Sequence, residues 1–202
     1  MLPVIGLTGG IGAGKAYVAQ LLAQHGAGLI DADAVSRGLT TTGGAAIPLI
    51  AQTFGADFVA IDGAMDRAKM RDLAFSYGTA KLKLEAILHP LIRAALDAQL
   101  LALSSAGVAK YIIAEIPLLF AAADYGQRYS RIVVVDCTIG QQIDRVQARS
   151  KLTREAALLI IARQTPRQVR LQLADDVVSN EGETSALAPQ ILALHEKYLK
   201  LR

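Results

Sequence analysis

The chain has 202 residues, of which 52% are hydrophobic and 19% are charged, a length typical of one compact unit with small inserted lobes. This composition excludes wholesale disorder, because enough apolar surface is available for a sizeable core. The single cysteine, Cys137, excludes an intramolecular disulfide and a zinc site made of several cysteines. Because Cys137 lies beside an apolar run, we interpret it as an inert, partly buried thiol rather than a nucleophile.

The net charge of +3 is distributed unevenly along the chain. Residues 144–170 carry seven arginines and lysines against two acidic residues, a net charge of +5, whereas the rest of the chain carries −2. A basic segment in an otherwise acidic chain favours a polyanionic small ligand, and a solvated helix face is the structural alternative. We expect no nucleic-acid partner, because the chain lacks tryptophan and the basic charge is local.

Residues 1–10 lack the basic region of an export signal, and their apolar stretch is interrupted at Gly9 and Gly10. Apolar runs such as residues 132–135 have the length of a strand and are far too short to cross a bilayer. We therefore expect a cytoplasmic protein with no membrane partner.

Short apolar runs alternate with helical patterns, which is typical of an α/β protein with a mainly parallel sheet, here of five strands. Strands are predicted at Val4–Leu7, Leu29–Ile30, Tyr111–Ala114, Ile132–Val135 and Asp176–Val178. Helices are predicted at Tyr17–His25, after the N-cap residue Thr153, and at Ala186–Leu201.

Between the second and third predicted strands lies a long stretch, Val35–Lys110, with mostly helical periodicity. It is too long for a simple crossover, so we expect a helical lobe at one edge of the sheet. The segment Ser150–Pro166 is a second inserted piece. No linker separates independent domains, so these pieces are interpreted as lobes of one domain.

The clearest motif is the glycine-rich run from Gly9 to Lys15, which matches the spacing G-x-x-x-x-G-K between a predicted strand and a predicted helix. Glycines allow backbone N–H groups to point inward around an anion, and the N-terminus of the following helix adds positive charge. Lys15 is expected to reach the β- and γ-phosphates of a nucleotide. The alternative is a glycine-rich turn with an exposed lysine.

The motif departs from the usual pattern at one position. A phosphate loop normally ends in Ser or Thr, whose hydroxyl ligates Mg²⁺, but Ala16 stands there and Tyr17 follows. The metal loses an oxygen ligand that only water can replace. We therefore expect phosphate binding to survive this change better than phosphoryl transfer.

Asp31 and Asp33 follow the second predicted strand, at the end of the sheet where ligands bind in open parallel sheets. On an extended segment, residues two apart point the same way, so both carboxylates are expected to face the cleft. One would accept the proton of an attacking hydroxyl, while the other would help to hold Mg²⁺ or a lysine. The alternative is a helix N-cap at Asp33.

Arg145 and Arg149 are four residues apart on a predicted helix and therefore share one face. Such a pair can stabilise charge on a transferring phosphoryl group. His89 precedes Pro90 in a helical region, where a lone histidine is usually a core residue or a cap.

Several of these segments together resemble the dephospho-CoA kinase family, over about residues 4–199. The resemblance is carried by Gly6–Gly12, Ile30–Asp33 with Arg37, Leu88–Pro90, Ile116–Leu119 and Ala174–Val177. The family uses ATP to phosphorylate the ribose 3′-hydroxyl of dephospho-CoA, the last step of coenzyme A synthesis. The resemblance implies a P-loop kinase core of residues 1–34, 111–143 and 171–202, a helical CoA-binding lobe of about residues 35–110, and a lid of about residues 144–170.

The resemblance also implies roles for individual residues. Asp33 is similar to the family's general base, while Lys15, Arg145 and Arg149 are similar to its phosphate-facing cations. The implied ATP-binding residues are Gly10, Ile11, Gly12, Ala13, Gly14, Lys15, Ala16 and Tyr17. The implied dephospho-CoA-binding residues are Thr8, Asp31, Asp33, Arg37, His89, Pro117 and Leu118.

Mg²⁺ is implied as the cofactor that accompanies ATP, and Asp31, Asp33 and Glu115 are candidates to hold it through water. The family has Ser or Thr at the position of Ala16 and usually Thr at that of Tyr17. The expected function is therefore the family reaction at a reduced rate. A protein that binds ATP or dephospho-CoA with little or no phosphotransfer is the alternative.

Overall fold

Five runs rich in valine and isoleucine form the strands in the computed structural model, which describes residues 2–116, 119 and 128–201. The strands in this part of the chain are β1 (Val4–Gly9), β2 (Gly28–Asp31), β3 (Ile112–Glu115), β4 (Arg131–Asp136) and β5 (Asp176–Ser179). All of them pair in parallel, in the order β2-β3-β1-β4-β5. The predicted five-stranded α/β sheet is confirmed, and β1 extends two residues further than the expected end at Leu7.

The helices connect these strands, as parallel pairing requires. They are α1 (Lys15–Gln24), α2 (Ala32–Leu39), α3 (Ile47–Phe54), η1 (Ala56–Phe58), α4 (Arg67–Ser76), α5 (Gly78–Ala106), α7 (Ile139–Ser150), α8 (Arg154–Ala162), α9 (Arg167–Gln172), η3 (Thr184–Ala186) and α10 (Leu187–Tyr198). Thr153 caps α8 as predicted, since its side chain accepts a hydrogen bond from the Ala156 amide. Helix α1 begins two residues before the expected Tyr17.

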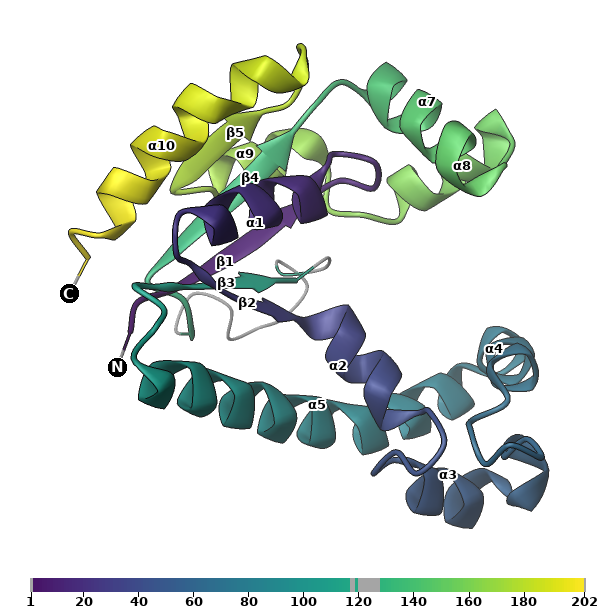
Figure 1. Cartoon of the computed structure of the whole chain (residues 1–202). Coiled ribbons are helices and arrows are strands. Elements are labelled where there is room, and N and C mark those ends of the chain that lie inside the picture. Colours follow the sequence, from purple (N-terminus) through teal and green to yellow (C-terminus); the bar gives the residue numbers. More distant parts are fainter. Residues whose placement is uncertain (1, 117–118, 120–127, 202) are drawn as a thin grey trace. The chain divides into compact units, whose positions relative to one another are not determined.

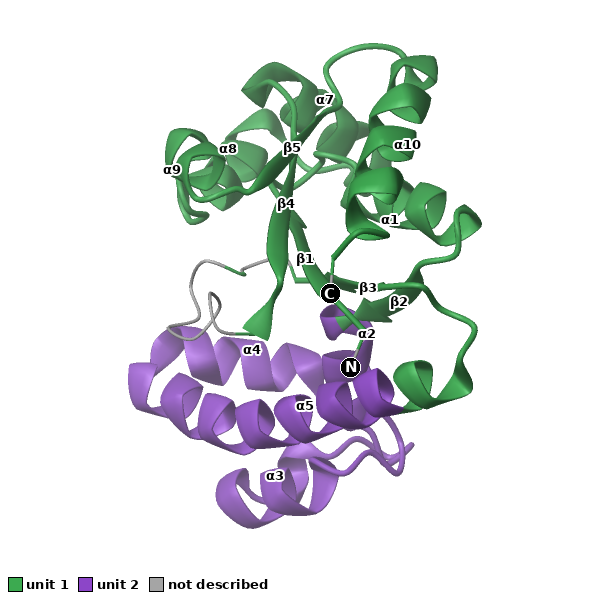
Figure 2. Ribbon diagram, turned by 90° about the vertical axis from the view of Figure 1, so that its left-hand side faces the viewer, with its two compact units in different colours: residues 1–31, 102–202 green, residues 32–101 purple. Residues whose placement is uncertain are grey.

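The chain forms two compact units, shown in different colours in Figure 2. Unit 1 contains residues 1–31 and 102–202 and holds the whole sheet. Unit 2 contains residues 32–101, that is, helices α2 to α4 and most of α5.

In unit 1, helices cover both faces of the sheet (Figure 1). On one face, side chains of α1 such as Leu22 and of α10 such as Ile191 pack against Ile5 and Val133. The other face is a smaller cluster around Val134, against which residues of α9 and its C-terminal flank pack. These clusters pack β1 and β4 from both sides, and loops follow the carboxyl ends of both strands.

In unit 2, a separate apolar cluster forms around Ile50 and Met70. Side chains of α5 spaced three or four residues apart, including Leu84, Leu88 and Leu91, pack against it, as the periodicity predicted. Helix α5 is also long and apolar enough to cross a membrane by length and composition, although none of that window is buried within the structure.

Cys137 lies at the end of β4 and is fully buried, more than the partial burial expected from the sequence. Burial raises the pKa of its thiol, because the charged thiolate is disfavoured away from water. The interpretation as an unreactive core residue therefore agrees with the structure.

His195, on α10, is a buried histidine that gives a testable pH dependence. Its side chain is 7% exposed, its Nδ1 lies 3.1 Å from the hydroxyl of Tyr111, and its ring is 5.2 Å from that of His25. Burial first, and then the charges of His25 and Lys110, lower its pKa below the ordinary value of 6.5. The folded protein therefore binds fewer protons than the unfolded chain as the pH falls below about 6.5.

We expect the contribution of His195 to the free energy of unfolding to be complete above pH 6.5 and to decrease as the pH falls through its lowered pKa. Urea denaturation between pH 5 and 8 measures this slope. The variant His195→Gln keeps a polar side chain that does not titrate, and it should flatten the curve. Equal slopes for the two proteins would show that His195 does not set the pH dependence.

Candidate functional site

The phosphate loop joins β1 to α1, at the carboxyl end of a central strand (Figure 1). Gly12 and Gly14 have φ angles of 72° and 97°, in the left-handed region that only glycine adopts without strain. A side chain at Gly14 would also collide with the amide of Asn180. Glycine is therefore required at both positions of the loop.

The Lys15 side chain folds back over the loop. Its Nζ donates hydrogen bonds to the carbonyls of Gly9 and Gly10, at 3.1 and 3.3 Å. The ammonium group is thus held beside the loop that is expected to surround an anion.

A cavity of about 260 Å³ opens beside this loop. It is lined by Gly12, Gly14, Lys15, Ala16, Tyr17, Glu115, Arg145 and Arg149. Two segments far apart in the sequence, the loop and α7, therefore bring three cations to one space, together with one carboxylate. A concave site with converging cations suits a polyphosphate.

The side chains of Arg145 and Asn180 donate hydrogen bonds to carbonyl groups of the loop. The guanidinium of Arg145 donates to the carbonyls of Gly12 and Ala13, at 3.4 and 3.5 Å, and to that of Asn180 at 2.9 Å. The amide of Asn180 donates to the Ala13 carbonyl at 2.7 Å. Because these bonds occupy carbonyl groups, they favour a loop whose N–H groups face the cavity.

Asp31 and Asp33 do not lie on one extended segment, so that expectation is wrong. Asp31 is the last residue of β2, and Asp33 is the second residue of α2. The helix begins directly after the strand, so the alternation of side chains along a strand does not apply. The N-cap alternative for Asp33 is also wrong, because Asp33 lies inside the helix. Its exposed carboxylate is instead in the first turn, where the helix dipole favours a negative charge.

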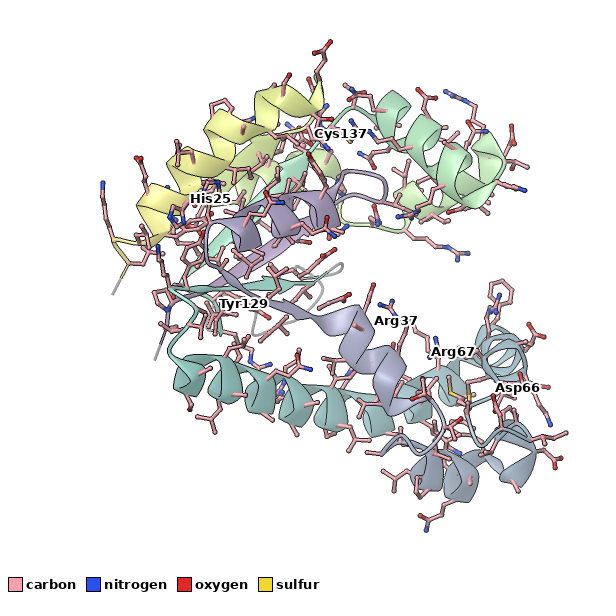
Figure 3. All side chains as sticks on the ribbon, viewed as in Figure 1. His25, Arg37, Asp66, Arg67, Tyr129 and Cys137 are labelled. Carbon is pink, nitrogen blue, oxygen red and sulfur yellow. The ribbon has the colours of Figure 1, made fainter. Side chains whose placement is uncertain are left out.

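Unit 2 has a cavity of its own, of about 350 Å³, lined by residues of α2, α4 and α5. Its cations are Arg37, Arg67 and Arg71, and its apolar residues include Met70 and Leu88. Figure 3 shows the positions of Arg37 on α2 and Arg67 on α4. The side chain of Arg67 donates to the carbonyl of Arg37 at 3.2 Å and to the hydroxyl of Thr40 at 2.9 Å, so these elements are linked.

The remaining candidates lie at separate places. Thr8 is buried in β1, and Glu115 ends β3 and lines the cavity in unit 1. His89 is exposed within α5, so it is neither a core residue nor a cap. Pro117 and Leu118 lie outside the described residues.

Several residues that contact the loop or the strand ends beside it are not evident from the sequence. Asn180 follows β5, Gln164 follows α8, and the Gln164 side chain accepts a hydrogen bond from the Ile11 amide at 3.1 Å. Arg167 contacts the carboxylate of Asp136, with its closest nitrogen at 2.6 Å, and this hydrogen bonding raises its pKa. The only available signal was that polar residues follow predicted elements, which is true of many surface loops.

The sequence model of the family described as dephospho-CoA kinase matches residues 3–186. A dephospho-CoA kinase of Burkholderia lata is 48% identical over 96% of this chain and 95% of its own length. A solved structure of a Thermus thermophilus protein has a TM-score of 0.82 at 30% identity and covers 97% of both chains. The dephospho-CoA kinase of Campylobacter jejuni has a TM-score of 0.71 at 22% identity and covers 98% of this chain and 97% of its own.

Proposed function

The chain belongs to the dephospho-CoA kinase family, and we propose that it transfers the γ-phosphate of ATP to the ribose 3′-hydroxyl of dephospho-CoA at the cavity around Lys15. The observation that carries this assignment is the convergence of Lys15, Arg145 and Arg149 on one cavity beside a glycine loop. A transferring phosphoryl group needs positioning and positive charge far more than it needs covalent chemistry.

On the ATP side, residues 10–17 surround the phosphates, and Lys15 moves from the loop carbonyls to the β- and γ-phosphates. Arg149 contributes charge from the same face of α7. Arg145 has two roles: it contributes positive charge to the phosphate site, and its guanidinium donates hydrogen bonds to loop carbonyls. The support for these roles is that all three cations line one cavity.

P-loop kinases generally use a divalent metal, and we propose Mg²⁺. No group of three or more His, Cys, Asp or Glu side chains among the described residues is arranged to hold a metal by itself. Mg²⁺ usually keeps several waters and binds through one or two carboxylates and the substrate phosphates. Glu115 is the carboxylate that lines the cavity, and it fits a water-mediated contact. When bound, the ion would neutralise charge on the β- and γ-phosphates.

On the acceptor side, we assign dephospho-CoA to unit 2 as the substrate lobe. Arg37, Arg67 and Arg71 suit its pyrophosphate, and Met70 and Leu88 suit its pantetheine arm. Thr8, Asp31, His89, Pro117 and Leu118 remain proposed contacts on the strength of the family resemblance alone.

We assign the general base to Asp33. Its carboxylate takes the proton of the 3′-hydroxyl as the hydroxyl oxygen bonds to the γ-phosphorus, and the bond between that phosphorus and the β–γ bridging oxygen breaks to release ADP. Asp33 is exposed, so its carboxylate is accessible to a substrate. We propose a cytoplasmic location, where ATP is available.

A coupled assay of ADP release with and without dephospho-CoA tests the whole proposal. Phosphotransfer requires release that depends on dephospho-CoA. A protein that only binds nucleotide would show ATP binding by calorimetry and no such release, and this is the result that would overturn the proposal.

The two substrates should protect different segments from hydrogen exchange. We expect dephospho-CoA to protect residues 35–110, and ATP alone to protect the phosphate loop and residues 144–170. The reason is charge, since the triphosphate is the more concentrated anion and residues 144–170 carry a net charge of +5. Mass spectrometry of peptides measures this. If ATP alone protected both regions equally, the assignment of the lid would be wrong.

A further inference from the structure

The tip of the phosphate loop, Gly10–Gly14, has few backbone hydrogen bonds within itself. Between Gly10 and Gly14 the internal backbone hydrogen bond is the one from the Ala13 amide to the Gly10 carbonyl, at 3.1 Å. In this stretch, Ile11 is the one residue whose side chain is larger than a methyl group. Besides the hydrogen bonds from Lys15, Arg145 and Asn180 to carbonyls of this stretch, the contacts of Ile11 therefore help to set its conformation.

Ile11 is attached to the lid segment in two ways. Its amide donates to Oε1 of Gln164 at 3.1 Å, across 153 residues of sequence. Its side chain packs into the apolar cluster formed by Ile143 and Val146 of α7 and Ala157 of α8. One attachment is polar and the other apolar, and both lead to the segment between β4 and β5.

The segment that follows Gln164 is held by ion pairs and hydrogen bonds. Three residues after Gln164, the guanidinium of Arg167 forms a bidentate ion pair with the carboxylate of Asp136, at nitrogen–oxygen distances of 2.6 to 3.1 Å. It forms a further ion pair with Glu181 at 2.7 Å. Arg170 is buried, and its guanidinium donates to the carbonyl of Thr165. The side chain of Gln164 therefore reaches the loop from a part of the chain that is tied to the end of β4.

Gln142 and Arg170 lie close to the backbone of the loop at Gly10. A side chain at Gly10 would come within 2.5 Å of Oε1 of Gln142 and 3.1 Å of a guanidinium nitrogen of Arg170. Gln142 is 1% exposed, and its amide nitrogen donates to the Cys137 carbonyl at 3.3 Å. Gln142 and Arg170 thus confine the loop at Gly10, and Gln164 confines it at Ile11.

We propose that Gln164 is a positioning residue, which fixes the tip of the phosphate loop through the Ile11 amide and so aligns the loop N–H groups with the transferring phosphate. The inference rests on the proposed phosphotransfer. The distance from nucleophile to phosphorus must be controlled closely, since a misplacement of about 1 Å can cost about 100-fold in rate. The Ile11 side chain adds an apolar contact to this hydrogen bond and links the loop to α7 and α8.

A competing role for the same contact predicts the opposite result. If the Gln164 oxygen occupied an amide that the phosphates need, removing it would strengthen ATP binding without lowering turnover. Measurements of kcat and of KM for ATP therefore distinguish a positioning residue from a side chain that competes with the phosphates for the Ile11 amide.

The contact itself is tested without activity, by hydrogen exchange of the Ile11 amide measured by NMR on the ligand-free full chain. Gln164→Met removes the acceptor but keeps the length, and exchange should accelerate about fivefold. Gln164→Glu keeps an acceptor and should retain protection. Gln168→Met makes the same chemical change at an exposed position of α9 and serves as the control. If exchange were unchanged in Gln164→Met, the contact would not hold the loop and the proposal would fail.

Steady-state kinetics then test positioning. We expect Gln164→Met to lower kcat by about tenfold with KM for ATP within about twofold of the parent value. Gln164→Glu should keep kcat within about threefold but raise KM for ATP, because its charge repels the triphosphate. A lower KM with unchanged kcat in Gln164→Met would establish the competing role and overturn the proposal.

If Gln164→Met does not fold, Gln164→Ser shortens the side chain out of reach of the Ile11 amide and gives the same readouts. Absence of dephospho-CoA-dependent ADP release in the parent protein would overturn the proposed function. The exchange measurement would still decide the Ile11–Gln164 contact, so the two failures are distinguishable.

Discussion

Replacing Asp33 with asparagine is expected to lower turnover by about 10² to 10⁴-fold while leaving the fold and ATP binding intact. The amide is nearly isosteric with the carboxylate but cannot accept the proton of the 3′-hydroxyl. The side chain is exposed in the first turn of α2 and is not part of the apolar cluster of unit 2, so the substitution removes little packing. The loss of a charge near a helix N-terminus costs about 0.3–1 kcal/mol of stability.

Turnover is measured by ADP release, ATP affinity by calorimetry, and stability by thermal unfolding. Asp72→Asn removes the same charge from an exposed position of α4 in the same unit, and it should behave like the parent protein. Unchanged turnover in Asp33→Asn would exclude Asp33 as the base. Equal losses in both variants would mean that the charge of unit 2, and not proton transfer, is responsible.

Ala16→Ser is expected to raise turnover by about tenfold or more while tightening ATP binding much less. Ala16 is exposed at the second position of α1 and lines the cavity with Lys15 and Glu115, so a hydroxyl there has space. One well-placed electrostatic contact is often worth about 2.7–4 kcal/mol in the transition state, and a substituting water recovers part of it. Ground-state binding is expected to change less, because in the proposed site the loop amides and Lys15 already bind the phosphates.

Two measurements test this effect: steady-state kinetics over a Mg²⁺ series, and the Mg²⁺ dependence of ATP binding by calorimetry. Ala23→Ser places the same hydroxyl two turns further along α1, outside the residues that line the cavity, and should change neither. If Ala16→Ser kept both the turnover and the Mg²⁺ dependence of the parent, Ala16 would not limit the reaction and other groups would hold the ion.

The phosphate loop was predictable because its requirements are local. Left-handed backbone at Gly12 and Gly14 needs glycine, and the run of apolar residues before the loop forms a buried parallel strand. The N-cap at Thr153 was predictable for the same reason, since an N-cap residue interacts with an amide only three residues away.

Asp33 shows where a local argument fails. Asp31 and Asp33 are two residues apart in a stretch that fits an extended strand end, but α2 begins at Ala32. The boundary between a strand and a helix depends on what each packs against, and spacing alone does not place it within two residues.

By itself, the sequence determined the α/β class, the glycine-rich loop with Lys15, and the pair of arginines on one face of α7, because each depends on residues at most a few positions apart. Only the tertiary structure decided the strand order β2-β3-β1-β4-β5 and the contacts that hold the loop. Asn180 reaches Ala13 across 167 residues, and Gln164 reaches Ile11 across 153. No periodicity relates residues so far apart, since their contact exists only after the strands have paired and brought their carboxyl ends to one edge of the sheet.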